Sequence, residues 1–265
     1  KRNVTFASAS GSKTYDGEPF IYDTCTLNSE TPLADGDTYK PFFANAVTEA
    51  ITADNEFTVV ISNSDGENND DNYNVTYQYG TLQIKPKQIT VKTPTKYRVY
   101  DATELTCDDY TIESETSVLD KDELVIRKTA SIINAGAVEN SVVIAVTEKL
   151  TGRDVKHNYE FVLALGDLIV DKRAITIQTP DAEKDYDGTP LTNKISTISD
   201  LTPPVKNHTV EVDVVGSRLS VGQSANTIGA VVITDEQGNN VTRNYEITKV
   251  EGILTVKGDG SDGSG

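Results

Sequence analysis

The chain has 265 residues, enough for one large domain or for two or three small ones. Its formal net charge of -17 gives a surface that repels phosphate groups, which argues against nucleic acids and anionic membranes as partners. No stretch approaches the roughly 18 apolar residues of a membrane span, and the start, Lys1-Arg2-Asn3, lacks a signal region, so we expect a piece of a longer protein.

A motif that returns every 86 residues organises the chain. Asn-Tyr occurs at residues 72–73, 158–159 and 244–245, and a glycine follows eight residues after each asparagine, at Gly80, Gly166 and Gly252. A fixed return of this length predicts tandem structural units. We assign residues 1–87 to repeat 1, 88–173 to repeat 2, 174–257 to repeat 3, and 258–265 to a flexible Gly/Ser/Asp tail.

Each repeat opens with a strand-like run and then a turn. The turn reads Tyr15-Asp16-Gly17 in repeat 1 and Tyr186-Asp187-Gly188 in repeat 3, where Asp can bond its own backbone and Gly accepts a positive φ. Repeat 2 has Tyr100-Asp101-Ala102, which predicts a variant or strained turn. We expect the three tyrosines to be core aromatics whose hydroxyls reach polar groups. The preceding Lys13, Arg98 and Lys184 should each pair with a nearby carboxylate.

The middle and the end of each repeat also favour strands. Residues 209–214 alternate apolar and polar side chains, and apolar runs follow at 57–61, 142–144 and 231–233. In the closing motif, we expect the tyrosines (Tyr73, Tyr159 and Tyr245) to plug the core in the manner of an Ig tyrosine corner. The asparagines (Asn72, Asn158 and Asn244) should shape the preceding turn by local hydrogen bonds. The glycines predict a hairpin turn or a bulge.

The joints between repeats are short. The closing strand of repeat 1 reaches the next strand across residues 85–88, and that of repeat 2 across 171–174, with no Gly/Ser linker at either joint. We therefore predict an all-β chain of three tandem Ig-like β-sandwiches, arranged as an elongated rod on the order of 100 Å long.

The paired motifs, Lys-x-Tyr-Asp-Gly-x-Pro at one end of a repeat and Asn-Tyr with its later glycine at the other, resemble the MBG/YDG-type Ig-like repeats of large bacterial surface proteins and adhesins. Repeat 2 departs from this pattern at Ala102 and Glu104. The resemblance covers nearly the whole chain. It implies an extracellular stalk at the bacterial cell surface or cell wall, with neighbouring repeats of the same parent chain as partners. It transfers no catalytic residue.

Catalytic chemistry has little support in the sequence. The two histidines, His157 and His208, lie in different repeats without a recurring nucleophile or carboxylate partner, so we predict a non-enzymatic protein. Cys25 and Cys107 lie in different repeats and out of register, which excludes a disulfide within one repeat and leaves free thiols or an approach between repeats.

A calcium site and isopeptide bonds are two further possibilities for stabilising the repeats. Asp65, Glu67, Asp70 and Asp71 could supply oxygen ligands to calcium, although basic residues occupy the matching loops of repeats 2 and 3, so a solvated turn is favoured and no cofactor is assigned. Isopeptide bonds from Lys13 and Lys184 to Asn72 and Asn244 are candidates by chain order alone, and Arg98 in repeat 2 argues against them.

Repeat 1 has extra aromatic residues that could recognise a host glycan or protein. They are Tyr22, Tyr39, Phe42, Phe43, Tyr77 and Tyr79. Binding through this repeat is the alternative to a spacer function.

Overall fold

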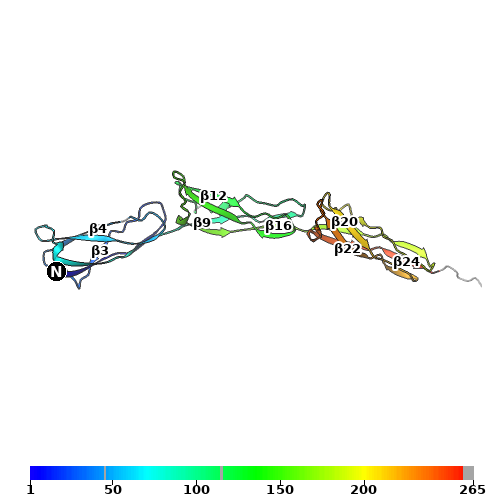
Figure 1. Ribbon diagram of the computed structural model, residues 1–265, viewed down its shortest axis with the longest axis horizontal. Coiled ribbons are helices and arrows are strands. Elements are labelled where there is room, and N and C mark those ends of the chain that lie inside the picture. Colours follow the sequence, from blue (N-terminus) through cyan, green and yellow to red (C-terminus); the bar gives the residue numbers. More distant parts are fainter. Residues whose placement is uncertain (45, 114–115, 259–265) are drawn as a thin grey trace, which may run out of the picture. The chain divides into compact units, whose positions relative to one another are not determined.

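The computed structural model describes residues 1–44, 46–113 and 116–258, and within them it has strands and short 3-10 turns but no α-helix (Figure 1). Repeat 1 contains β1 (Arg2–Ser8), β2 (Gly11–Thr14), β3 (Cys25–Leu27), β4 (Thr38–Phe43), β5 (Thr52–Asp54), β6 (Phe57–Ser62), η1 (Asp70–Asn72), β7 (Tyr73–Gln78) and β8 (Thr81–Lys85).

Repeats 2 and 3 return the same order of elements. Repeat 2 contains β9 (Lys87–Lys92), β10 (Lys96–Val99), β11 (Thr111–Ile112), β12 (Asp122–Lys128), β13 (Gly136–Glu139), β14 (Val142–Glu148), η2 (Lys156–Asn158), β15 (Tyr159–Ala164) and β16 (Asp167–Asp171). Repeat 3 contains β17 (Arg173–Gln178), β18 (Ala182–Asp185), β19 (Thr197–Ile198), β20 (Thr209–Val214), β21 (Gly222–Ala225), β22 (Ile228–Thr234), η3 (Thr242–Asn244), β23 (Tyr245–Val250) and β24 (Ile253–Lys257).

Each repeat is built from two layers of strands. In repeat 1, the sheet β3-β1-β7 supplies Val4 and Phe6 to the core, and the antiparallel pair β4-β6 supplies Phe57 and Ile61. These side chains are at most 1% exposed and belong to one cluster, because alternate residues of each strand face inward. The predicted all-β fold of three repeating sets of strands is therefore confirmed.

The first and last strands of a repeat run parallel and change sheets together. β1 pairs in parallel with β7, and β2 pairs in parallel with β8, so the chain passes through Gly80 without reversing. Each of the two paired segments advances four residues between the pair Ala7–Gln78 and the pair Gly11–Leu82. Neither segment therefore has an extra residue that could form a bulge. The hairpin or bulge predicted at Gly80, Gly166 and Gly252 is thus wrong.

The close approach of two backbones explains these glycines. A Cβ on Gly80 would lie 2.5 Å from the carbonyl carbon of Ala9, and Gly166 and Gly252 face the same obstacle at the matching places. A buried asparagine closes the crossing, since Asn55 Nδ2 donates to the carbonyl of Ala9 at 2.9 Å while Ser8 Oγ donates to the carbonyl of Asn55. Asn140 and Asn226 repeat this bond to Pro94 and Pro180.

The chain divides into two compact units that do not coincide with the repeats. One unit comprises Lys1–Lys92, Tyr110–Arg127 and Val143–Ala164, and the other comprises Thr93–Asp109, Lys128–Val142 and Leu165–Gly265. Each unit therefore contains one whole repeat, part of repeat 2 and one junction between successive repeats.

Candidate functional site at the junctions between repeats

A single residue links successive repeats. Pro86 separates β8 from β9, and Lys172 separates β16 from β17. Beside each link, the backbone amide of the turn tyrosine donates to the last strand of its own repeat: Tyr15 to Lys85 and Tyr100 to Asp171, both at 2.8 Å. The turn is thereby fixed next to the point where the following repeat begins.

The turn itself is held by the predicted ion pair. Lys13 Nζ lies 2.7 Å from Asp16 Oδ1 and Lys184 Nζ lies 2.6 Å from Asp187 Oδ1, while Arg98 is 3.6 Å from Asp101. Asp187 Oδ1 also accepts from the Thr189 amide. The lysine, followed by these Thr189 bonds, holds the pKa of Asp187 well below its usual range.

The predicted strain in the second turn is present. Gly17 and Gly188 have φ of 81° and 78°, and Ala102 at the matching position has φ of 64°. A side chain in this left-handed region costs roughly 1–2 kcal/mol, a cost that glycine avoids.

The turn tyrosines are junction residues. Tyr15 is 4% exposed and meets Tyr159 of the next repeat edge to face, with ring centroids 5.5 Å apart. Tyr100 is 2% exposed and meets Tyr245 in the same way at 5.6 Å. The prediction of a core position is wrong for Tyr186, which is 50% exposed.

The tyrosines of the Asn-Tyr motif are buried as predicted. The hydroxyls of Tyr73, Tyr159 and Tyr245 accept the backbone N–H groups of Ala34, Leu119 and Val205. The Tyr159 hydroxyl also donates to Asp122 Oδ2 at 2.5 Å, and Asp122 is only 2% exposed. Burial, reinforced by this carboxylate, raises the pKa of Tyr159.

The asparagines of the same motif join two repeats, so the prediction of purely local bonding is wrong for two of them. Asn158 Oδ1 accepts the Ala50 amide at 2.7 Å, and Asn244 Oδ1 accepts the Ala135 amide at 2.9 Å. Both asparagines are fully buried. Asn72 is exposed and bonds locally to Asn69. The asparagine side chain can bond either to another repeat or within its own loop, and the surface next to it decides between the two.

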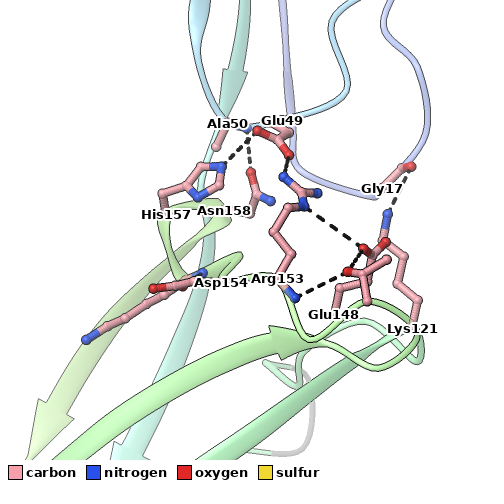
Figure 2. Close-up of polar contacts among 11 residues, drawn as sticks. Gly17, Glu49, Ala50, Lys121, Glu148, Arg153, Asp154, His157 and Asn158 are labelled. Carbon is pink, nitrogen blue, oxygen red and sulfur yellow. Dashed lines mark hydrogen bonds and ion pairs between the residues drawn. The ribbon is translucent and has the colours of Figure 1, made fainter.

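Charged side chains surround the first junction (Figure 2). Glu49 of repeat 1 pairs with Arg153 of repeat 2 and lies 3.1 Å from Nε2 of His157. The Arg153 guanidinium, followed by His157, lowers the pKa of Glu49 against the opposing effect of burial. On the other side, Lys121 Nζ lies over the Tyr15 ring and 3.4 Å from the Gly17 carbonyl.

Other polar side chains meet at the second junction. Asn244 Nδ2 donates to Asn134 Oδ1 at 2.9 Å, and His208 Nδ1 lies 2.7 Å from the Tyr245 hydroxyl. Buried apolar residues of repeat 2, including Leu168 and Tyr100, form one cluster with those of repeat 3. An open cleft of about 450 Å³ lies beside this contact.

Sequence reasoning placed neither His157 nor Glu49 at a junction. The signal was the register: Glu49 and Asn134 each stand directly before the alanine whose amide is bound. Both histidines lie at a junction, His157 beside Glu49 and His208 beside Tyr245.

The acidic loop of repeat 1 is closed by its own hydrogen bonds. Asp70 Oδ1 accepts the Ile61 amide at 2.7 Å, and Asp70 Oδ2 accepts from Asn68. Asn63 Oδ1 accepts the amides of Asp65 and Glu67. Within residues 1–44, 46–113 and 116–258, no group of three or more His, Cys, Asp or Glu could hold a metal ion, so the calcium alternative at Asp65, Glu67, Asp70 and Asp71 has no support.

The structure separates the extra aromatics of repeat 1 into two groups. Tyr39, Phe43 and Tyr77 are partly buried and pack against the core, which argues against a binding surface at these three positions. Tyr22, Phe42 and Tyr79 are exposed by 40%, 47% and 44%. Phe42 and Phe43 are neighbours in β4, so the alternation along that strand turns Phe43 inward and Phe42 outward, whereas Tyr22 and Tyr79 lie outside the strands.

The residues considered for a disulfide or an isopeptide bond are not paired with one another in the described part of the chain. Cys25 and Cys107 are free. Lys13 and Lys184 bind the aspartates of their own turns, whereas Asn72 and Asn244 lie at the opposite end of the repeat and bond to Asn69 and Asn134.

In the part of the chain that the structure covers, no helix has the length and apolar character needed to cross a membrane.

No protein-family model matches the chain, and no curated protein matches its sequence. Solved structures of tandem-domain proteins are similar at a low level. The three N-terminal domains of the Highly Immunogenic Outer Capsid protein (Hoc) of bacteriophage RB49 are 11% identical, with 97% of this chain and 98% of that chain covered and a TM-score of 0.23.

Two further structures show the same degree of likeness. Drosophila N-cadherin EC1-3 is 12% identical over 97% of this chain and 98% of that chain, with a TM-score of 0.19. The N-terminal four Ig domains of Dscam1 isoform 9.44 are 11% identical over 97% of this chain and 73% of that chain, with a TM-score of 0.17. Likeness at this level carries no argument about function.

Proposed function

We propose that the chain is a non-enzymatic structural segment of a bacterial surface protein or adhesin, a stalk that spaces a functional tip from the cell. The observation that carries the proposal is the junction. At both junctions, a buried asparagine of one repeat binds a backbone amide of the preceding repeat, and a tyrosine from each side packs against the other. A spacer needs such direct contacts between successive repeats, because they restrict the bending of the chain at each junction.

The resemblance to MBG/YDG-type repeats supports the proposal from the sequence side. Its two motifs supply the junction residues, with the turn tyrosine on one face and Asn-Tyr on the other. The fixed single-residue link limits bending further, since a linker of this length has little freedom of its own.

Small-angle X-ray scattering of the full chain tests the spacer. We expect an elongated particle whose maximum dimension is on the order of 100 Å, as three strand-linked repeats require. The double variant Asn158→Ala with Asn244→Ala should broaden the distance distribution, and Asn72→Ala is the matched control because Asn72 binds no other repeat. A maximum dimension near that of a compact globule of this mass would contradict the proposal.

The proposed extracellular location has a separate test. We expect the parent protein to carry a signal peptide, further repeats and a wall anchor, and intact cells to lose the repeats when treated with an external protease. Retention of the repeats inside protease-treated cells would contradict a surface location.

Adhesive binding through repeat 1 is the second candidate. It rests on Phe42 and Tyr79, which are exposed, and on the stacking of Tyr79 against Tyr77 at 6.1 Å between centroids. An array of host glycans and matrix proteins should then bind the full chain and fail to bind the variant Phe42→Ala with Tyr79→Ala. Tyr97→Ala, at a 69% exposed position of repeat 2, is the control. Equal binding by all three proteins would leave the spacer alone.

A further inference from the structure

The first and last strands of a repeat form one parallel ladder along its length. In repeat 1, Arg2 of β1 pairs with Tyr73 of β7 at one end of the ladder, and Thr14 of β2 pairs with Lys85 of β8 at the other end. The chain therefore enters the repeat at one end of the ladder and leaves it at the opposite end. Repeat 3 has the same arrangement, with β17 parallel to β23 and β18 parallel to β24.

A pull on the two ends of a repeat loads this ladder in shear. Force on Arg2 and on Lys85 acts along the strands in opposite directions, because the two residues stand at opposite ends of the ladder. All the hydrogen bonds between the paired strands then share the load, whereas a pull across the strands breaks them one after another. Both strands are also anchored in the core, since Phe6 of β1 and Leu82 of β8 are at most 1% exposed.

The crossing at Gly80 ties the two strands together through a third segment. The Gly80 amide donates to Ser8 Oγ at 2.9 Å, and Ser8 Oγ donates to the Asn55 carbonyl at 2.6 Å. Asn55 in turn donates its amide to the Gly80 carbonyl and its Nδ2 to the Ala9 carbonyl. Ser8 and Asn55 are both buried, so a break in these bonds leaves polar groups without a partner.

Repeat 3 builds the same crossing. The Gly252 amide donates to Thr179 Oγ1 at 3.1 Å, and Thr179 Oγ1 donates to the Asn226 carbonyl at 2.7 Å. Asn226 donates its amide to the Gly252 carbonyl and its Nδ2 to the Pro180 carbonyl. The hydroxyl changes from serine to threonine while the bonds are kept, so the crossing is a feature of the repeat.

The crossing glycine also blocks sliding of the two strands. A Cβ at Gly80 would lie 2.5 Å from the carbonyl carbon of Ala9, well inside van der Waals contact. A slip of the last strand by one residue would bring Tyr79 or Thr81 to this place, and both carry a Cβ. The same slip would turn every inward side chain of the strand outward. The strands therefore separate by breaking the ladder as a whole.

We propose that each repeat is a force-resisting unit, in which the parallel ladder and its glycine crossing form a clamp against tension along the chain. This inference rests on the proposed stalk, since a spacer that holds a functional tip is pulled at its two ends. The clamp lies within a single repeat and uses none of the junction residues. It gives Ser8, Asn55 and Gly80 a mechanical role, which is to keep the ladder in register under load.

Single-molecule pulling on the full chain in two directions tests the clamp. One protein carries attachment handles at Lys1 and Lys85, which load repeat 1 along its strands. The other carries them at Asn3 and Asn74, an exposed pair on β1 and β7, so that this pull opens the ladder from one end. The handles are azide-bearing residues, because the chain has two free thiols of its own. Denaturant melts check that the two labelled proteins are equally stable.

We expect repeat 1 to unfold at least about tenfold more slowly at a given force when it is pulled along the strands, a difference of about 1.4 kcal/mol in the barrier. Unfolding along the strands should occur in one step without earlier extension. Equal rates in the two directions overturn the clamp and leave the stalk standing. A compact particle in small-angle scattering, together with unequal rates, overturns the stalk and leaves the clamp as a property of the repeat.

The crossing has a test of its own in the strand-parallel pull. Asn55→Ala loses two side-chain bonds to backbone carbonyls, and we expect its unfolding rate under force to rise about tenfold. Asn63→Ala is the matched control, because Asn63 also makes two side-chain bonds to the backbone but lies in a loop outside the ladder, and its rate should stay unchanged. Ser8→Ala, which removes the hydroxyl between Gly80 and Asn55, is a milder second variant. Equal rates for all three variants would overturn the role of the crossing.

Discussion

At the first junction, Asn158 is flanked by the ion pair of Glu49 and Arg153; at the second, Asn244 is flanked by the neutral side chain of Asn134. The tyrosine contact is nearly the same at both, with centroids 5.5 and 5.6 Å apart. The comparison teaches which parts of the joint are general. The aromatic pair and the asparagine bond recur, whereas the ion pair of Glu49 and Arg153 is a feature of the first junction.

Removal of either motif tyrosine should have the largest effect. Tyr159→Ala and Tyr245→Ala are each expected to lower the free energy of unfolding by about 3–5 kcal/mol, as a large-to-small change in a core does. Denaturant melts measure the loss. Tyr186→Ala is the control, because this tyrosine is half-exposed. A loss below about 1 kcal/mol for Tyr159→Ala would show that the ring is not part of a core.

The hydroxyl alone should distinguish the two junctions. Tyr159→Phe leaves the carboxylate of Asp122 buried without its donor, so we expect a loss of about 1–3 kcal/mol. Tyr245→Phe removes a contact to His208, which is only partly buried, and should cost less. Equal losses in denaturant melts would remove this distinction.

The asparagines should come next. Asn158→Ala loses the bond to the Ala50 amide, whereas Asn244→Ala loses the bonds to both Ala135 and Asn134. We expect losses of roughly 1 kcal/mol and 2 kcal/mol, at about 1 kcal/mol for each hydrogen bond. Hydrogen exchange should quicken at Ala50 in the first variant and at Ala135 in the second, and unchanged exchange at both amides would contradict the assignment.

The turn beneath each junction provides a stabilising change. Ala102→Gly relieves a residue with φ of 64°, and we expect a gain of about 0.5 kcal/mol after the greater freedom of glycine in the unfolded chain is counted. Gly17→Ala should do the reverse and cost more, since its Cβ would lie 2.9 Å from Leu119 Cδ1 of the next repeat. Melting temperatures that move in the same direction for both variants would contradict this reading.

The charge difference should give the smallest effect, visible in its pH dependence. Since the pKa of Glu49 is lowered from 4.5 in the folded chain, its contribution to stability is present above that pH and is lost as the pH falls through the folded value. Glu49→Asn, which installs the residue of the second junction, should remove this acid-dependent part of the melting temperature and its sensitivity to salt. A variant that keeps the same acid and salt dependence would place its source elsewhere.

The sequence by itself determined the repeat, its 86-residue period, the strands and the burial of Tyr73, Tyr159 and Tyr245, because strand alternation and turn chemistry are local properties. It also predicted the strain at Ala102, since only glycine adopts a positive φ without cost. The same motif residue, however, has different surroundings in different repeats.

Only the tertiary structure decided the burial and the bonding partners of these motif residues. Tyr15 is buried and Tyr186 is exposed, and Asn158 bridges two repeats where Asn72 bonds locally, although each pair shares its motif. The glycines proved to be crossing points of parallel strands, which a single segment cannot reveal because the obstacle is a backbone some 70 residues away. Burial and partner are properties of two surfaces in contact, and the sequence of one repeat describes only one of them.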